Sequence, residues 1–300
     1  MISFRQLRAL IGIADHLHFR RAAETLHITQ PALSTQLRQL EAQLGVTLVE
    51  RSRSHVILTP VGEAIAERGR LILRDVEELS DIARHSLQPF TGTIRLGVLP
   101  TIGPYLMPHV LPGLHAAYPR LKIYVREGKA DDLLTQLTQG NFDLLILPLP
   151  IERQGVQVRP LAVEPLLVAL SVEHRLAGRK ALRRSDLAGE EVLIMESGHR
   201  LHEQAGALCE EIGARALTDY EGTSLDALRQ MVGLGIGITF LPQLYARLEA
   251  EKDTQVVTLP VIDRPPYREL AVLWRARSPL SEELTTIADA IREWLSDAIG

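Results

Sequence analysis

The sequence predicts an α/β protein in three parts: an amino-terminal winged helix-turn-helix, a long helix, and a two-lobed α/β region. Three observations lead to this prediction. Two short helix patterns separated by a brief turn lie within residues 19–44. Apolar residues then recur with heptad spacing over 61–88, and apolar strands alternate with helices from residue 94 onward.

The second short helix has its own start signals. Thr29 can cap it through the side-chain oxygen, and Pro31 falls in the first turn, where no backbone donor is needed. Apolar residues at helical spacing give it one buried face: Ala32, Leu33, Leu37, Leu40 and Leu44. Polar residues off that face can hydrogen-bond to base edges or phosphates: Gln30, Ser34, Thr35 and Arg38. The pattern indicates a helix for the DNA major groove, and a helical hairpin with a solvated polar face is the alternative.

Residues 48–60 predict a wing beside this helix. Two short apolar runs enclose a turn that carries Arg51 and Arg53, and two arginines there suit contact with a phosphate backbone.

Charge and composition fit a cytoplasmic DNA-binding protein. The net charge is −4, but residues 1–60 hold seven Arg and four acidic residues, a net of +3, which leaves −7 for the remainder. The single cysteine excludes an intramolecular disulfide framework. No apolar run approaches the roughly 20 residues that span a membrane. The 300 residues exceed one ordinary core, so several domains are expected.

Residues 61–88 read as one long helix with a heptad seam. Small or apolar residues alternate at spacings of four and three: Ile65, Gly69, Ile72, Val76, Leu79, Ala83 and Ser86. Such a seam packs against a second helix, so this segment is predicted to pair two copies of the chain. A helix packed on its own domain is the alternative. Pro89 is expected to end the helix, and residues 90–92 to form a hinge.

Strand and helix patterns alternate through the rest of the chain. Strands are expected at 94–99, 121–125, 142–147, 166–170, 192–195, 236–241 and 270–274, with helices near 103–115, 131–139, 202–212, 224–232 and 281–299. This is typical of an α/β fold with a largely parallel sheet. We expect domains at 1–60, 61–89 and 92–300, the last divided into lobe I (about 92–164 and 268–300) and lobe II (about 165–267). A small ligand would bind between the lobes.

Loops that open predicted helices supply the candidate ligand contacts. Thr101 follows a strand and precedes a helix, where backbone donors and a hydroxyl can meet an anion. Residues 197–200 open another helix, and residues 223–226 have capping-box spacing with Asp in the last place. For each serine and threonine, a plain helix cap is an equal alternative.

Several strings resemble the LysR-type transcriptional regulators. They are Arg21-Ala22-Ala23, Thr29-Gln30-Pro31-Ala32-Leu33-Ser34, Leu40-Glu41 and Leu58-Thr59-Pro60-Val61-Gly62. The resemblance implies DNA contacts at Thr29, Gln30, Pro31, Ser34, Thr35 and Arg38, with Arg51 and Arg53 on the wing. It also implies a regulatory domain similar to periplasmic binding proteins, homodimers that pair into tetramers, and promoter DNA and RNA polymerase as partners.

Further strings resemble the peroxide-sensing members of that family. They are residues 99–109, Gly198-His199, Gln204, Cys209, residues 223–225 and residues 237–242. In those members a reactive cysteine follows Gly-His and a second lies nine positions on, but here Arg200 takes the first place and only Cys209 remains. A disulfide within one subunit is therefore impossible. Oxidation of Cys209 to sulfenic acid would still allow an oxidative-stress response, and a buried, inert Cys209 is the alternative.

Arg200 suggests a rival signal. A cation at a helix entry, beside His199 and across from Thr101, suits a carboxylate or phosphate, unless it merely points into solvent. The expected effector is hydrogen peroxide or a small anionic metabolite. The expected effector-binding residues are Thr101, Gly198, His199, Arg200, Gln204 and Thr223.

Other chemistry finds no support in the sequence. His199 and His202 are three apart, but one cysteine and no nearby carboxylate pair make a poor metal site. Nothing resembles a nucleophile with a base and an orienting partner, so neither an enzyme nor a cofactor is expected. A solute-binding protein would need export and would have no use for residues 1–60.

Overall fold

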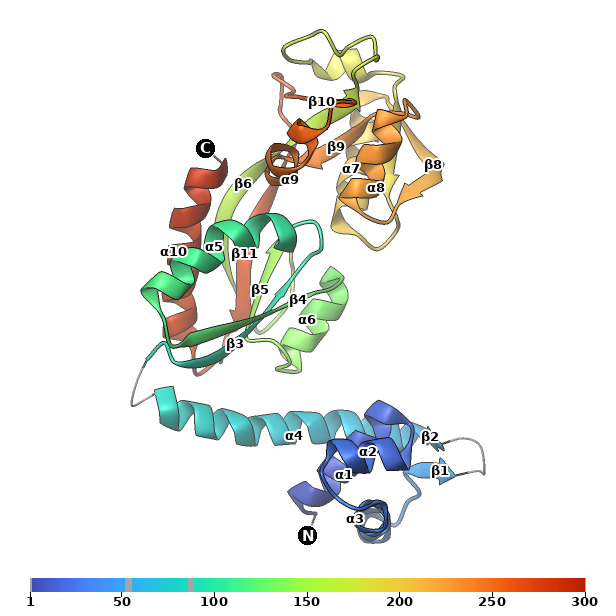
Figure 1. Ribbon diagram of the computed structural model, residues 1–300, viewed down its shortest axis with the longest axis vertical. Coiled ribbons are helices and arrows are strands. Elements are labelled where there is room, and N and C mark those ends of the chain that lie inside the picture. The colour runs from blue at the N-terminus through green and yellow to red at the C-terminus, as the bar shows by residue number, and fades with distance from the viewer. Residues whose placement is uncertain (1, 52–55, 86–88, 300) are drawn as a thin grey trace. The chain divides into compact units, whose positions relative to one another are not determined.

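The computed structural model describes residues 2–51, 56–85 and 89–299. It divides into two compact units, Met1–Leu87 and Gln88–Gly300 (Figure 1). The first unit has one apolar core, and the second has two. The predicted combination of a helix-turn-helix and an α/β domain is confirmed. None of the described helices is long and apolar enough to cross a membrane.

The first unit begins as a winged helix-turn-helix. Its elements are α1 (Phe4–His16), α2 (Phe19–Thr25), α3 (Gln30–Leu44) and a hairpin of β1 (Val49–Arg51) and β2 (Val56–Leu58). Leu33, Leu37 and Leu40 of α3 are fully buried. Ala32 is exposed, contrary to prediction, because it precedes Leu33 by one residue and so lies about 100° away around the helix.

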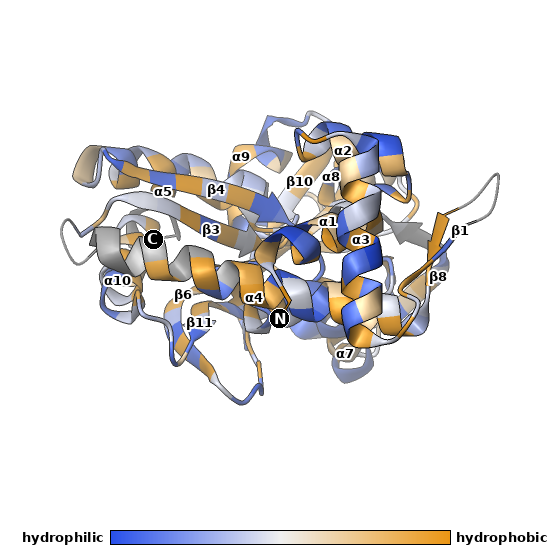
Figure 2. Cartoon of the chain, turned by 90° about the horizontal axis from the view of Figure 1, so that it is seen from below, coloured by the Kyte–Doolittle hydropathy of each residue, from blue (hydrophilic) through white to orange (hydrophobic). Residues whose placement is uncertain are grey.

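Helix α4 (Pro60–His85) packs on its own domain at one end and exposes apolar side chains beyond it. Ala66 is buried, and a side chain at Gly69 would meet Leu7 and Ile11 of α1 at 3.4 Å. Ile72 and Leu79, by contrast, are 37% and 65% exposed. Figure 2 shows orange, hydrophobic bands along α4. The predicted seam is therefore wrong at Gly69, and its free part starts at Ile72.

The second unit alternates strands and helices. Its strands are β3 (Gly92–Val98), β4 (Leu121–Glu127), β5 (Leu144–Pro148), β6 (Val156–Ser171), β7 (Glu191–Met195), β8 (Arg215–Gly222), β9 (Thr239–Pro242), β10 (Val256–Leu259) and β11 (Tyr267–Arg275). Its helices are α5 (Gly103–Ala117), α6 (Ala130–Thr138), α7 (Arg200–Ile212), α8 (Leu225–Gly233), α9 (Gln243–Leu248) and α10 (Ser281–Ile299), with short 3₁₀ turns at Arg184–Leu187 and Ala250–Lys252. Phe90 is packed instead of forming a free hinge: its ring stacks on Tyr118 with centroids 4.2 Å apart.

The main sheet is mixed. Its strand order is β10-β6-β11-β5-β3-β4, with β9 also paired to β6, while β7 and β8 form a separate parallel pair. Among the described strands of the large sheet, the parallel pairs are β3–β4 and β3–β5. The expectation of a largely parallel sheet is therefore wrong, because β6 and β11 run antiparallel to each other and to the strands beside them.

Two cores lie along this sheet. One gathers residues from β3, β5, β11, α5 and α10, and the other gathers residues from β7, α7, α8 and β9. The first part of β6 pairs with β11, and its last part, from Leu166, pairs with β9 and β10. β6 therefore passes from lobe I into lobe II, which gives the two-lobed fold (Figure 1).

A buried ion pair joins the neighbouring strands β6 and β11 at the passage between the lobes. Arg268 of β11 and Glu164 of β6 are 2% and 0% exposed, with Nε and Oε2 2.7 Å apart. The second Glu164 oxygen accepts the Leu244 N–H of α9 at 2.9 Å. Removing either partner would leave an uncompensated buried charge.

Replacing Glu164 with Ala should therefore lower the free energy of unfolding by about 3–5 kcal/mol. Urea unfolding followed by tryptophan fluorescence reports on this unit, because both tryptophans, Trp274 and Trp294, lie in it. Lys252→Ala breaks an exposed pair with Glu249 and should cost less than about 1 kcal/mol. Equal losses in the two variants would contradict the role of the buried pair.

Candidate DNA interface and effector site

The polar side of α3 is open to solvent. Thr29 caps the helix by accepting the Ala32 N–H at 3.4 Å, as predicted from the sequence. Arg38 donates to the Ser34 carbonyl and the Thr35 hydroxyl, each at 3.4 Å. Such long, exposed bonds are weak and are readily exchanged for bonds to a ligand. The remaining predicted contacts here, Gln30 and Pro31, are also exposed.

The wing is fastened to α3 by a motif glutamate. Glu41 accepts the Leu48 N–H at 2.9 Å and the Val49 N–H at 3.3 Å, which places β1 against the end of the helix. Arg51 ends β1, whereas Arg53 lies outside the described residues.

The exposed apolar part of α4 is where we predict that a second copy of the helix packs. Ile72→Asp would place a carboxylate in that seam and should convert dimers into monomers, as sedimentation velocity would show. Asp75→Asn changes an exposed residue of the same helix and should leave the mass unchanged. An unaltered mass for Ile72→Asp would exclude α4 as the pairing helix.

Thr101, predicted as a ligand contact, is buried and accepts hydrogen bonds from a neighbouring arginine. It is 4% exposed, and Arg268 donates to its hydroxyl at 3.2 Å and to its carbonyl at 2.9 Å. Because the hydroxyl oxygen accepts from Arg268, its own proton is left to donate elsewhere. Arg268 and Glu164 were not predicted as site residues. Because charged residues are rarely buried unless they are paired, their positions within apolar strand sequences could have indicated a buried ion pair.

The start of α7 carries charges from both lobes. Arg200 is the first residue of α7 and pairs with Glu203 at 3.2 Å, and the N-cap residue His199 makes no capping hydrogen bond through its side chain within the described structure. His199 lies 3.4 Å from Glu196, and Lys129 of lobe I lies 3.9 Å from the same carboxylate. Gly198 adopts φ +88°, and a side chain there would meet the Lys129 ammonium at 3.3 Å. Lys129 and Glu196 were missed by sequence reasoning, since the fold alone brings them together.

The other predicted contacts have separate surroundings. Ser224 caps α8 by accepting the Ala227 N–H at 3.1 Å, so the expected cap one residue earlier is wrong and Thr223 is simply exposed. Gln204 has a buried side-chain oxygen with no partner among the described residues. No described hydrogen bond joins Thr101 to His199 or to Arg200.

Cys209 lies in the core of lobe II. It is 2% exposed in the last turns of α7, and burial raises the pKa of its thiol to about 11. A buried thiol with a raised pKa holds little thiolate at neutral pH. The Nδ1 atom of His202, on the same helix, lies 2.7 Å from the Met195 carbonyl.

The thiol of Cys209 should therefore react slowly while the chain is folded. A pKa raised from 9.0 to about 11 lowers the thiolate fraction near neutral pH by about 100-fold. Iodoacetamide at pH 7.5 should alkylate native protein at least that much more slowly than protein in urea, as mass spectrometry would show. Because the thiol holds its proton more tightly when folded, stability should fall as the pH rises from about 9 towards 11. Alkylation at equal rates would contradict the burial.

Comparisons with known proteins agree with this architecture. The bacterial regulatory helix-turn-helix protein, lysR family, matches residues 4–63, and the LysR substrate binding domain matches residues 87–296. The DNA-binding transcriptional dual regulator OxyR of Escherichia coli K12 is 41% identical over 97% of this chain and 95% of its own. The hydrogen peroxide-inducible genes activator of Pectobacterium carotovorum is 40% identical over 97% and 96%. A solved full-length OxyR variant from Pseudomonas aeruginosa aligns with a TM-score of 0.75 and 30% identity, covering 97% and 98%.

The fold and the similarity to known regulators together define a transcriptional regulator and not an enzyme. The chain belongs to the LysR family, as its sequence motifs predicted. Its similarity to OxyR extends over nearly the whole chain. In the part of the chain that the structure describes, no group of three potential ligands could hold a metal ion.

Proposed function

We propose that this regulator binds promoter DNA through α3 and the wing and changes transcription when its second unit receives a signal. The proposal is supported mainly by α3, which begins at the Thr29 cap and exposes its polar side to solvent. The second helix of a helix-turn-helix motif enters the DNA major groove. The contacts would come from Thr29, Gln30, Pro31, Ser34, Thr35 and Arg38, with Arg51 and Arg53 on the phosphates. RNA polymerase is the expected partner at the promoter, in the cytoplasm.

Arg38→Ala should weaken DNA binding by about 1–3 kcal/mol, roughly 5- to 150-fold. Fluorescence anisotropy with DNA from upstream of the protein's own gene measures this loss. Gln39→Ala alters an exposed neighbour on α3 that is not assigned a contact, and it should bind as the parent does. Unchanged affinity for Arg38→Ala would refute its assignment.

Two copies are needed for useful affinity. The amino-terminal 60 residues carry only +3, so one module neutralises few phosphates. Pairing through α4 presents two modules to two half-sites, and pairing of the second units would give a tetramer. A signal then acts by changing how the modules are spaced.

Hydrogen peroxide is the first candidate signal, supported by the names of the relatives. The Cys209 thiolate would attack one peroxide oxygen, the O–O bond would break, and hydroxide would leave and take up a proton. The resulting S–OH places a polar group in the lobe II core and would loosen α7. The burial and raised pKa of Cys209 oppose this route unless the end of α7 opens first.

A small anionic metabolite is the second candidate, supported by the charges at the start of α7. Arg200 replaces the reactive cysteine of peroxide sensors, and Lys129 approaches the same loop from lobe I. Both cations have acidic partners that are themselves partly exposed, so a carboxylate or phosphate could displace them.

Footprinting on the upstream DNA separates these signals. A stoichiometric peroxide pulse that shifts protection in the parent but not in Cys209→Ser would establish the single-thiol route. If peroxide shifts neither protein, while succinate or phosphate shifts the parent but not Arg200→Ala, the anion route holds. Protection without any response would reject both signals and leave DNA binding intact.

A further inference from the structure

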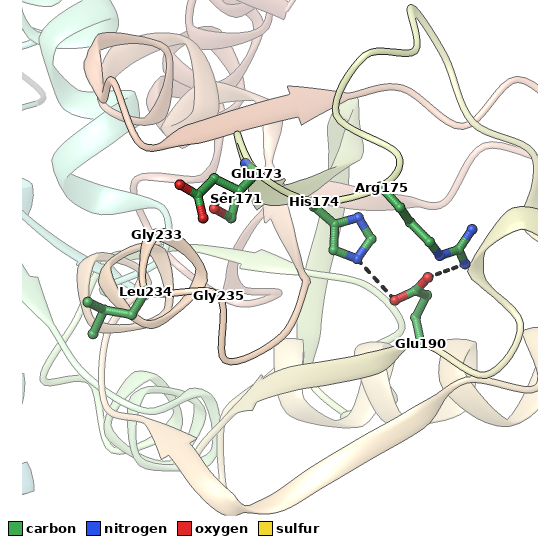
Figure 3. Close-up of a pocket in the computed structure, with 8 residues that line it drawn as sticks. All are labelled: Ser171, Glu173, His174, Arg175, Glu190, Gly233, Leu234 and Gly235. Atoms are coloured by element: carbon green, nitrogen blue, oxygen red, sulfur yellow. Dashed lines mark hydrogen bonds and ion pairs between the residues drawn. The ribbon is translucent and has the colours of Figure 1, made fainter.

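A cavity opens on lobe II, and none of the residues assigned so far lines it. It has a volume of about 530 Å³ and is formed by the end of β6, the residue before β7 and the turn after α8 (Figure 3). Its lining residues are Ser171, Glu173, His174, Arg175, Glu190, Gly233, Leu234 and Gly235. Small-molecule sites usually measure roughly 300–1,000 Å³.

The two basic side chains of this cavity, Arg175 and His174, are both paired with Glu190. Arg175 pairs with one oxygen of Glu190 and also donates to the Asp186 carbonyl. The other Glu190 oxygen lies 3.2 Å from His174 Nε2. His174 Nδ1 accepts the Leu176 N–H at 3.3 Å, so Nε2 is the nitrogen that donates to Glu190. With both oxygens engaged and only 14% of its side chain exposed, Glu190 fixes Arg175 and His174 in the wall.

Glu173 is the charge that remains. Its N–H donates to the Ser171 hydroxyl at 3.4 Å, which holds the turn. Its exposed carboxylate forms no ion pair with any residue that the structure describes, and Figure 3 draws contacts only at Glu190. The cavity therefore has a net negative charge, and Glu173 is free to bind a cation.

The carboxyl end of α8 and the turn that follows it add partial negative charge to the cavity. α8 ends at Gly233, so the negative end of its dipole lies at the cavity wall. Gly235 has φ +75°, and no atom lies within 4 Å of the position a side chain would take, which keeps this side open. Leu234 is 78% exposed and offers apolar surface beside the opening.

From this balance we infer that lobe II binds a small primary alkylammonium ion. Its ammonium group lies at Glu173 and the end of α8, and its alkyl chain lies along Gly235 and Leu234. An anion is disfavoured, because Arg175 and His174 are occupied by Glu190. This site does not depend on the signal read at α7.

Saturation-transfer NMR on the full chain tests the site with three probes of one shape. Butylammonium should receive more saturation than 1-butanol, and butyrate should receive the least. Glu173→Gln keeps the size of the side chain but removes its charge, and it should weaken butylammonium binding about two- to fivefold, as expected for an exposed ion pair. Glu152→Gln changes an exposed glutamate of lobe I and should bind as the parent does.

Three results would overturn the inference. They are an absent butylammonium signal in the folded parent chain, a butyrate or butanol signal as strong as that of butylammonium, and equal weakening in the two glutamine variants. Circular dichroism of each variant confirms that the fold is retained.

Discussion

The buried pair between Arg268 and Glu164 is the interaction that holds the parts of the second unit in register. The two residues face each other on β11 and β6 at the passage between the lobes. The same guanidinium binds Thr101 after β3, and the same carboxylate binds the start of α9 at Leu244. Since each charge would be costly alone in this environment, four chain segments are held to one arrangement.

Contact between the lobes is uneven as a consequence. At the crossing strands it is buried and charged, and Tyr105 of α5 packs edge-on against Tyr245 of α9 with ring centroids 5.0 Å apart. At the start of α7, the lobes meet through Lys129 and Glu196, which are 49% and 37% exposed. An exposed pair contributes little, so it can be exchanged for a ligand while the buried pair stays intact. That difference is what hinged closure around a ligand requires.

The chemistry of Cys209 follows from the same packing. Lobe II forms its core from α7, α8 and β7, and Cys209 is one of the residues that fill it. A thiol in such a place behaves as a small apolar group, whereas Arg200, nine residues earlier, is partly exposed. The position that carries the reactive thiol in peroxide sensors therefore carries a charge here. An oxidant such as peroxide must therefore reach Cys209, which is buried in the core of lobe II.

The sequence by itself determined the elements whose signals are local. Thr29, Pro31 and the apolar spacing of Leu33, Leu37 and Leu40 specify α3 whatever surrounds it, and the buried strands of lobe I have continuous apolar runs. It missed β8, because that strand is largely polar, and it also missed β10, α9 and the part of β6 before residue 166. Only the tertiary structure decided that Gly69 faces α1 and that Arg268 meets Glu164. The latter pair is 104 residues apart in the chain, and its contact depends on strand register, which no local pattern encodes.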